Sequence, residues 1–237
     1  MGSDTHSHPS GERWRYDALD RPVDSAMVDC HTHTYVSGDS NTTIDEFVEA
    51  FERSGLTHVF VTDHQSISAY PPLQEVLGPR VICGQEQRAA EGEVIGLFLT
   101  NKIPAGLKLA DASKAIRDQG GIVYICHPLD KKRFSIGYGD LIAALENEHV
   151  DAIELYNSKS LAVDLRLSKL SSEYGIPMLG GSDAHVASAI GSSGAAMPWF
   201  DSAATFLEAA SSATAFGCHC DPRKSWPLRV VPPTPPS

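Results

Sequence analysis

The sequence lacks long apolar runs and any excess of positive charge. No stretch approaches the ~18 apolar residues of a membrane-spanning helix, and the first residues contain no apolar signal core, so we expect no export and no membrane partner. Lys and Arg number 19 against 30 Asp and Glu, which gives a net charge of −11. Proteins that coat nucleic acid are normally basic, so long nucleic acid is an unexpected partner.

Cysteine is also scarce. The five cysteines form an odd number and lie mostly in apolar, strand-like segments. This pattern is typical of reduced thiols in a cytoplasmic protein rather than of a disulfide framework. Cys218 and Cys220 flank His219 and could bind a metal ion, but no second ligand pair accompanies them, so a structural role is favoured.

Histidine, in contrast, is plentiful. The 237 residues include ten His beside the many acidic residues, which together are the donors that a metal site needs. A hydrophobic content of 42% is typical of a globular protein, and this length can form one domain without disulfides. We predict a single domain over residues 25–221, preceded by a polar N-terminal segment (1–24) and followed by a Pro-rich C-terminal tail (222–237).

Short apolar runs alternate with helix-like segments along this domain. The runs are rich in Val and Ile and lack period-two alternation, as in strands buried on both faces; they cover residues 26–30, 58–62, 80–84, 94–99, 122–126, 152–156 and 177–181. The clearest helix follows a cap at Thr43, has apolar residues at helical spacing from Ile44, and ends at Gly55. Further helices are predicted over residues 109–119, 138–148, 161–174 and 202–215. This alternation predicts a parallel α/β sheet, open or closed into a barrel.

Chemically distinctive residues follow the ends of these predicted strands. They are His31 and His33, Asp63 and His64, Glu86, His127, Asn157, and Asp183 and His185. In a parallel α/β fold these strand ends meet at one face, and side chains two residues apart on an extended segment point the same way. Imidazoles with carboxylates suit Zn, Mn or Fe. The number of candidates fits two or three ions that share a bridging carboxylate, clamp a phosphate and turn bound water into hydroxide.

The ordered motifs resemble a known family. VDCHTHTYVSGDS, VTDH, GQEQRAAEGEVIGLFL, ICHP, IELYN and GGSDAH are similar, in this order, to the PHP (polymerase and histidinol phosphatase) family of metal-dependent phosphoesterases. The resemblance covers residues 26 to 217 and implies a distorted (β/α)7 barrel that holds up to three Mn, Zn or Fe ions. It implies the following ligands: His31, His33, Glu86 and Asp183 for a first ion; Glu86, as a bridge, with His127 and Asn157 for a second; Asp39, His64 and His185 for a third. Gly38 stands where many members have Asp, and Asn157 where many have His.

Neighbouring polar residues are given structural roles. We expect Asp63 to orient another side chain, and Glu154 to lie at the edge of the site or behind the ligands. We expect Glu91 and Glu93 to be solvated, His58 to pack, and Asp29, Cys30 and Cys126 to point away from the site.

The first functional hypothesis is hydrolysis of a small phosphomonoester, such as a nucleotide or nucleoside bisphosphate. A metal-bound hydroxide, held by the ligands with Glu86 bridging, would attack phosphorus. Arg88, Lys132 and Arg133 are candidates for binding the phosphate. Two alternatives stay open: a phosphodiesterase or exonuclease acting on short oligonucleotides, and a catalytically silent metal-binding interaction module.

Overall fold

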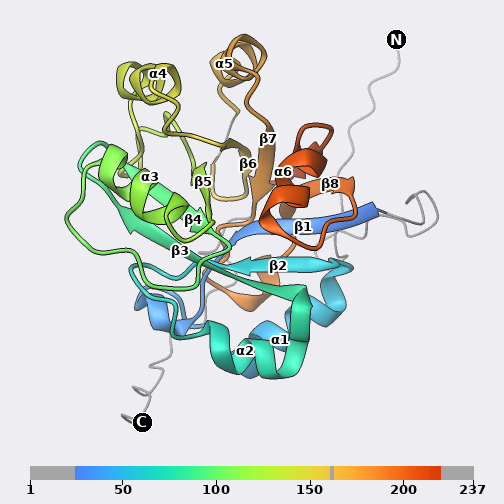
Figure 1. Cartoon of the computed structure of the whole chain (residues 1–237). Helices are drawn as coiled ribbons and strands as arrows, with labels where there is room; N and C mark the ends of the chain where they lie inside the picture. Colours follow the sequence, from blue (N-terminus) through green and yellow to red (C-terminus); the bar gives the residue numbers. More distant parts are fainter. Residues whose placement is uncertain (1–24, 161–162, 220–237) are drawn as a thin grey trace, which may run out of the picture.

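The computed structural model describes residues 25–160 and 163–219, so the predicted N-terminal segment and Pro-rich tail lie outside the described residues. One sheet has the strand order β7-β6-β5-β4-β3-β2-β1-β8-β9, and six α-helices of the described chain surround it (Figure 1). The strands are β1 (Ser25–Thr32), β2 (His58–Val61), β3 (Val81–Arg88), β4 (Glu93–Leu97), β5 (Ile122–Ile125), β6 (Ala152–Asn157), β7 (Met178–Gly181), β8 (Ser193–Pro198) and β9 (Thr214–Gly217). The α-helices are α1 (Ile44–Ser54), α2 (Tyr70–Leu77), α3 (Leu109–Arg117), α4 (Tyr138–Glu146), α5 (Arg166–Tyr174) and α6 (Ala203–Ala210).

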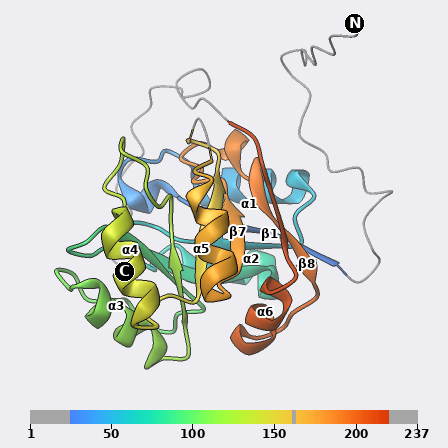
Figure 2. The ribbon, with the colours of Figure 1, turned by 90° about the horizontal axis from the view of Figure 1, so that it is seen from above.

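Strands β1 to β7 form a nearly closed barrel. The chain that leaves β7 returns to the end of β1, where the Asp183 amide donates to the His31 carbonyl at 2.7 Å and the His33 amide donates to the Ala184 carbonyl at 3.0 Å. Figure 2 shows β7 beside β1 and β8 when the barrel is seen from above. The predicted distorted α/β barrel in a single domain is confirmed.

Strand direction differs from the prediction at three places. β4 runs antiparallel to both β3 and β5, and the added strands β8 and β9 are antiparallel to their neighbours. A crossover needs a dozen or more residues, whereas β3 and β4 are joined by a tight turn in which the Ala89 amide donates to the Gly92 carbonyl at 2.9 Å. The sequence of β8, SGAAMP, is rich in small residues and therefore has little strand signal.

The helices begin and end largely as expected. α1 has a capping box formed by Thr43 and Glu46, and Gly55 ends it at a φ of 81°. α2 was not among the predicted helices; it begins with Pro71 and Pro72 in its first turn, where proline is tolerated. Across the described ranges, none of the helices combines the length and apolarity needed to cross a bilayer.

Alternation along the strands divides the core into an inner and an outer part. On and just after β5, Ile122, Tyr124 and Cys126 belong to the cluster inside the barrel, whereas Val123 and Ile125 pack outward against α3, α4 and α5. The inner cluster includes residues of α6, which therefore covers one end of the barrel. Polar side chains gather at the opposite end, where the parallel strands finish.

Candidate metal centre

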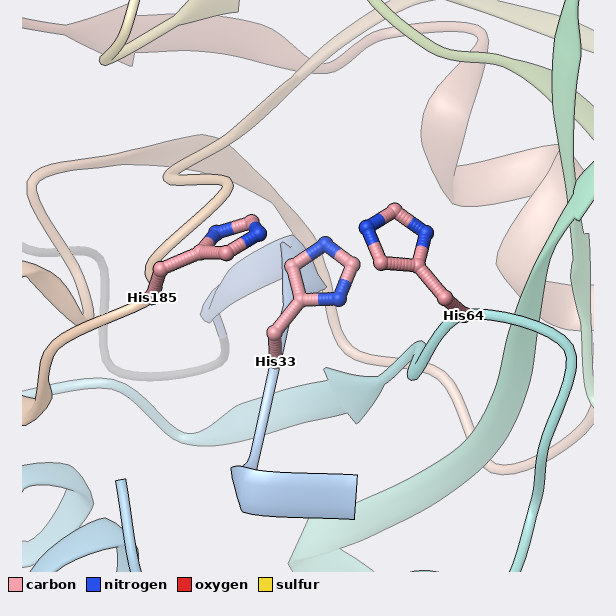
Figure 3. A group of neighbouring side chains, drawn as sticks. All are labelled: His33, His64 and His185. Carbon is pink, nitrogen blue, oxygen red and sulfur yellow. The ribbon is translucent and has the colours of Figure 1, made fainter. Parts of the chain in front are cut away.

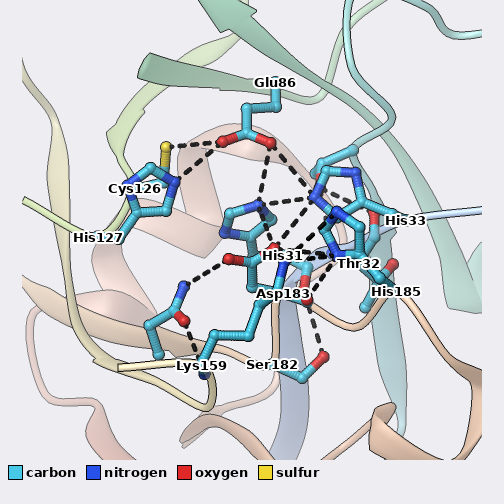
Figure 4. A network of polar contacts seen from close by, with 12 residues as sticks. His31, Thr32, His33, Glu86, Cys126, His127, Lys159, Ser182, Asp183 and His185 are labelled. Carbon is cyan, nitrogen blue, oxygen red and sulfur yellow. Dashed lines mark hydrogen bonds and ion pairs between the residues drawn. The ribbon is translucent and has the colours of Figure 1, made fainter. Parts of the chain in front are cut away.

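Four imidazoles surround the carboxylate of Glu86 at the carboxyl end of the barrel, and Figure 4 shows three of them, those of His31, His33 and His127. Glu86 Oε2 lies 3.3 Å from His31 Nε2, 3.2 Å from His33 Nε2 and 3.0 Å from His64 Nδ1. The other oxygen, Oε1, lies 3.1 Å from His127 Nε2. One oxygen of Glu86 thus faces three imidazoles and the other oxygen faces a fourth, which is the arrangement that a bridging ligand requires.

Asp183 faces the same group from the end of β7. Its Oδ1 lies 3.4 Å from His33 Nε2 and 3.7 Å from His31 Nε2. The same carboxylate forms ion pairs with Lys159, whose Nζ lies 3.3 Å from Oδ1, and with the guanidinium of Arg133. Two cationic side chains therefore stand next to the proposed ligands.

Asp39, His64 and His185 also lie together. Asp39 Oδ2 is 3.3 Å from His64 Nε2 and 3.2 Å from His185 Nε2. The ring of His33 lies between those of His64 and His185, with centroid distances of 4.5 Å and 4.2 Å (Figure 3). Asp39 directly after Gly38 can thus reach both imidazoles, despite its shifted position in the motif.

Asn157 is close to these groups, but its amide oxygen is turned elsewhere. Its Nδ2 donates to Glu154 Oε2 at 2.9 Å and to Asp183 Oδ2 at 3.2 Å. Its Oδ1 accepts from the Lys159 backbone amide at 3.0 Å. Asn157 as a metal ligand therefore stays a prediction.

Two proposed ligands have backbone conformations that non-glycine residues rarely adopt. His127 has a φ of 31° and Asp183 a φ of 51°. The His127 amide donates to Glu154 Oε2 at 2.5 Å, and the Asp183 amide donates to the His31 carbonyl at 2.7 Å. Such conformations persist where surrounding bonds hold them, and they are concentrated at functional sites.

The electrostatics of the cluster fit divalent cations. Burial opposes charge on His31, but Asp183, Glu86 and Glu154 outweigh it and raise its pKa well above the ordinary value. Burial likewise opposes ionisation of Glu86 and Asp183, yet the adjacent His31 and other donors bring the pKa of both carboxyls well below their usual range. Burial opposes charge on His64 too, but hydrogen bonds to Asp39 and Glu86 raise its pKa to about 10. The carboxylates of Glu86 and Asp183 are therefore ionised although they are buried, and neighbouring positive charge is needed to stabilise them.

The spacing of the donor atoms also fits divalent cations. Three donor atoms lie within 4.8 Å of one another in each of several overlapping sets, among them His31, His33 and Glu86, and His33, His64 and His185. Imidazole nitrogen and carboxylate oxygen are the donors that Zn, Mn and Fe accept, so the residues present fit such ions.

Asp63 orients the site, in agreement with the sequence prediction. Its carboxylate accepts from the amide and hydroxyl of Thr34 at 2.7 and 2.8 Å, and from the Ser37 hydroxyl at 2.6 Å. The Ser37 oxygen lies 2.9 Å from His33 Nδ1. Asp63 therefore fixes the loop that directs Nε2 of His33 toward Glu86.

His58, Cys218 and His219 make structural contacts, as the sequence analysis expected. His58 is buried against Phe200, at a ring distance of 4.6 Å. Cys218 Sγ donates to the Ser192 carbonyl at 3.4 Å, and His219 Nδ1 lies 3.0 Å from the Ser158 carbonyl. Cys220 lies outside the described residues.

Three residues have positions that the sequence interpretation missed. Glu93 is not solvated: its side chain is only 11% exposed, and Oε2 lies 3.8 Å from His127 Nε2. Cys126 does not point away: its Sγ lies 3.4 Å from Glu86 Oε1. Inward alternation along β5 could have indicated Cys126, and the β3–β4 hairpin could have indicated Glu93, but no motif singles out Lys159.

The predicted phosphate-binding residues line a cleft above these donors. The cleft has a volume of about 500 Å³, and its walls include Arg88, Lys132 and Arg133 together with Lys159. Arg133 is largely buried, with 16% of its side chain exposed, whereas Arg88 is 63% exposed. The guanidinium of Arg88 lies 4.9 Å from the centre of the Phe134 ring.

Known structures share this fold. A two-domain protein from Bacteroides vulgatus, containing a predicted PHP-like metal-dependent phosphoesterase, is 18% identical with a TM-score of 0.69 over 82% of this chain and 65% of that chain. PsfC from Pseudomonas syringae is 18% identical, with a TM-score of 0.63 over 82% of this chain and 92% of that one. Endonuclease Q, in complex with a 27-mer duplex carrying an abasic lesion, is 16% identical with a TM-score of 0.64 over 78% of this chain and 56% of that one. These likenesses establish the fold.

A family profile matches the C-terminal part of the described chain. Residues 166–214, from α5 to the start of β9, match the family described as PHP-associated. This match supports the resemblance to the PHP family that the sequence motifs indicated. Two uncharacterized relatives of this chain occur in Methanocaldococcus jannaschii. MJ1587 is 29% identical over 62% of this chain and 92% of its own length, and MJ0417 is 37% identical over 44% of this chain and 46% of its own length.

Proposed function

We propose that this protein is a metal-dependent phosphoesterase of the PHP type that hydrolyses a small phosphomonoester. The observation that carries the proposal is the placement of Glu86, whose Oε2 faces His31 and His33 while Oε1 faces His127. A shared carboxylate between two groups of donors is what a site for two or more ions needs.

The described donors divide into three positions. His31, His33, Glu86 and Asp183 would hold one ion; Glu86 and His127, with Asn157 as a further candidate, a second; and Asp39, His64 and His185 a third. Bound divalent ions supply Lewis-acid polarisation of the phosphoryl group and activate water near neutral pH. The protein's part is to hold these donors in place and to bind the substrate beside them.

The cationic side chains of the cleft are suited to the phosphate. Lys159 and Arg133 both contact the Asp183 carboxylate, one from each of its oxygens. When cations neutralise Asp183, these two side chains become available to an anionic substrate at the same place. The planar guanidinium of Arg133 can bind two phosphate oxygens at once, and Lys159 adds a point charge.

The size of the cleft favours a small substrate. This cleft adjoins a second cleft of about 370 Å³. The two clefts share His127, Lys132 and Lys159, and the second one also has an apolar wall. Leu129, Leu155 and Leu167 make part of its wall, and such a half-apolar recess suits the organic part of a phosphoester. The net charge of −11 opposes binding to long duplex DNA.

One observation favours the second candidate, a phosphodiesterase. The fold resembles that of Endonuclease Q, whose structure contains DNA, although this chain covers 56% of that protein. We therefore propose to compare p-nitrophenyl phosphate with bis(p-nitrophenyl) phosphate in the presence of Mn²⁺ or Zn²⁺. The proposal predicts faster hydrolysis of the monoester, whereas cleavage of the bis-ester alone would favour the phosphodiesterase.

The same experiment addresses the third hypothesis, a silent metal-binding module. Such a module would bind ions but cleave neither ester. Element analysis of the metal-supplemented protein should accompany the two assays. It distinguishes a protein that binds metal but has no activity from a protein that is inactive because it holds no metal.

A further inference from the structure

Cys126 lies inside the barrel and directly beside Glu86 and His127. It continues the inward-facing row of Ile122 and Tyr124, so its side chain points into the barrel at the end where the donors gather. It is fully buried, and its Sγ lies 3.4 Å from Glu86 Oε1 (Figure 4). The same oxygen lies 3.1 Å from His127 Nε2.

We propose that Cys126 is a thiolate ligand of the second metal position. The donor atoms of Cys126, Glu86 and His127 all lie within 4.8 Å of one another, which one ion can span. The inference rests on the metal centre of the proposed function, but it adds a sulfur donor and with it a metal class. Sulfur with imidazole and carboxylate selects Zn²⁺, Co²⁺ or Fe²⁺ over Mn²⁺ and Mg²⁺.

The alternative donor at this position is less well placed. The oxygen of Asn157 accepts from the Lys159 amide, and its nitrogen faces Glu154 and Asp183. Without a contribution from Asn157, His127 and Glu86 need a further donor, and Glu93 is a more distant candidate whose Oε2 lies 3.8 Å from His127 Nε2. Cys126 is the residue whose donor atom forms a close set with both Glu86 and His127 among the described residues.

The other buried cysteines differ from Cys126. Cys30 packs in the inner apolar cluster and Cys83 in the outer one, and neither belongs to a set of neighbouring donors among the described residues. Cys83→Ser is therefore a matched control for Cys126→Ser, since both replace a buried sulfur by oxygen.

Ligation has a definite proton balance. The Cys126 S–H bond breaks, a sulfur–metal bond forms, and the proton passes to the buffer. The competing explanation is that the thiol only donates a hydrogen bond to Glu86 and positions it. Serine retains that donor but is a poor substitute for a thiolate, so Cys126→Ser separates the two.

The experiment is Co²⁺ titration of the metal-free full-length protein, followed by absorption spectroscopy. A thiolate bound to Co²⁺ gives a sulfur-to-metal charge-transfer band in the near ultraviolet. We expect the band in the wild type, in Cys83→Ser and in a Cys218→Ser/Cys220→Ser variant, and its loss in Cys126→Ser. Competition between Zn²⁺ and Mn²⁺ should shift toward Mn²⁺ by about tenfold or more in Cys126→Ser alone.

Absence of the band from the wild type, or its persistence in Cys126→Ser, would overturn the proposal. If Cys126→Ser does not fold, X-ray absorption of the Zn²⁺-loaded Cys218→Ser/Cys220→Ser protein replaces the comparison. The spectrum should show a sulfur neighbour of Zn²⁺ at ~2.3 Å. A shell of nitrogen and oxygen atoms alone would refute the proposal. Hydrolysis of p-nitrophenyl phosphate with Mn²⁺ is scored separately, because it tests the proposed function and not this ligand.

Discussion

Glu154 and His31 form a fully buried pair, in which Glu154 Oε1 lies 3.2 Å from His31 Nδ1. The contact leaves Nε2 of His31 directed at Glu86, 3.3 Å away. A carboxylate behind an imidazole fixes its tautomer and its orientation, and it raises the basicity of the nitrogen that faces the metal. Glu154 thus lies buried behind two of the proposed ligands and not at the exposed edge of the site.

Glu154→Gln should therefore weaken metal binding. The neutral amide cannot replace the carboxylate, which accepts from both His31 and the His127 amide. We expect metal affinity to fall by about 10–100-fold, measured by competition with a chelating dye. Glu52→Gln is the control, because Glu52 forms an exposed ion pair with Arg80; equal losses in both variants would contradict this role.

Gly181→Ala should disturb the same pair. A Cβ at Gly181 would overlap the Cβ of His31 and the Oε1 of Glu154. Overpacking of this kind lowers the free energy of unfolding by about 1–3 kcal/mol. Gly139→Ala, in α4 with open space around its Cβ, should cost little. Chemical denaturation of both variants checks this, and a stable Gly181→Ala protein with normal metal affinity would contradict it.

Lys159→Met should weaken binding of the product, inorganic phosphate, by about tenfold, since it removes one charge beside the proposed phosphate position. Metal affinity should be retained or increased, because Lys159 lies near Asp183 and 3.0 Å from His185 Nδ1. Phosphate inhibition and metal titration measure the two effects. Lys102→Met, at an exposed position, is the control. A parallel loss of metal affinity would instead assign Lys159 a structural role.

His58 should make stability depend on pH. Burial, with a contribution from Arg80, lowers its pKa from 6.5 to about 4. The unfolded chain therefore binds more protons between these values, so the stabilising effect of neutral His58 is complete above pH 6.5 and is lost as pH falls toward 4. Denaturation in EDTA at pH 7 and pH 5 should show a smaller difference for His58→Gln than for the wild type. Equal differences would refute this assignment.

The sequence predicted the barrel and the position of most donors, because both depend on local patterns. Strand ends are marked by Val- and Ile-rich runs, and residues two apart, such as His31 and His33, face the same way. The direction in which neighbouring strands pair was harder to predict from the sequence. The reversal at β4 depends on the short turn between β3 and β4 and not on the composition of the strands.

The missed residues depend on three-dimensional context. Cys126 was placed in packing by simple alternation with His127, but the positive φ of His127 brings both side chains toward Glu86. Lys159 belongs to no ligand pattern and approaches Asp183 only through the fold. Alternation along β5 indicates the inward direction of Cys126, but neither the bend at His127 nor the approach of Lys159 has a local sequence signal.

The central claim is that the cluster around Glu86 binds the ions on which phosphoester hydrolysis depends. The most direct measurement is p-nitrophenyl phosphate hydrolysis by metal-free protein as Mn²⁺ or Zn²⁺ is added stepwise, with bound metal counted in parallel. We expect activity to rise with at least two bound ions per chain, as a shared carboxylate implies. His33→Ala should bind fewer ions and lose activity while it unfolds cooperatively. Full activity in the metal-free protein, or in His33→Ala, would contradict the account.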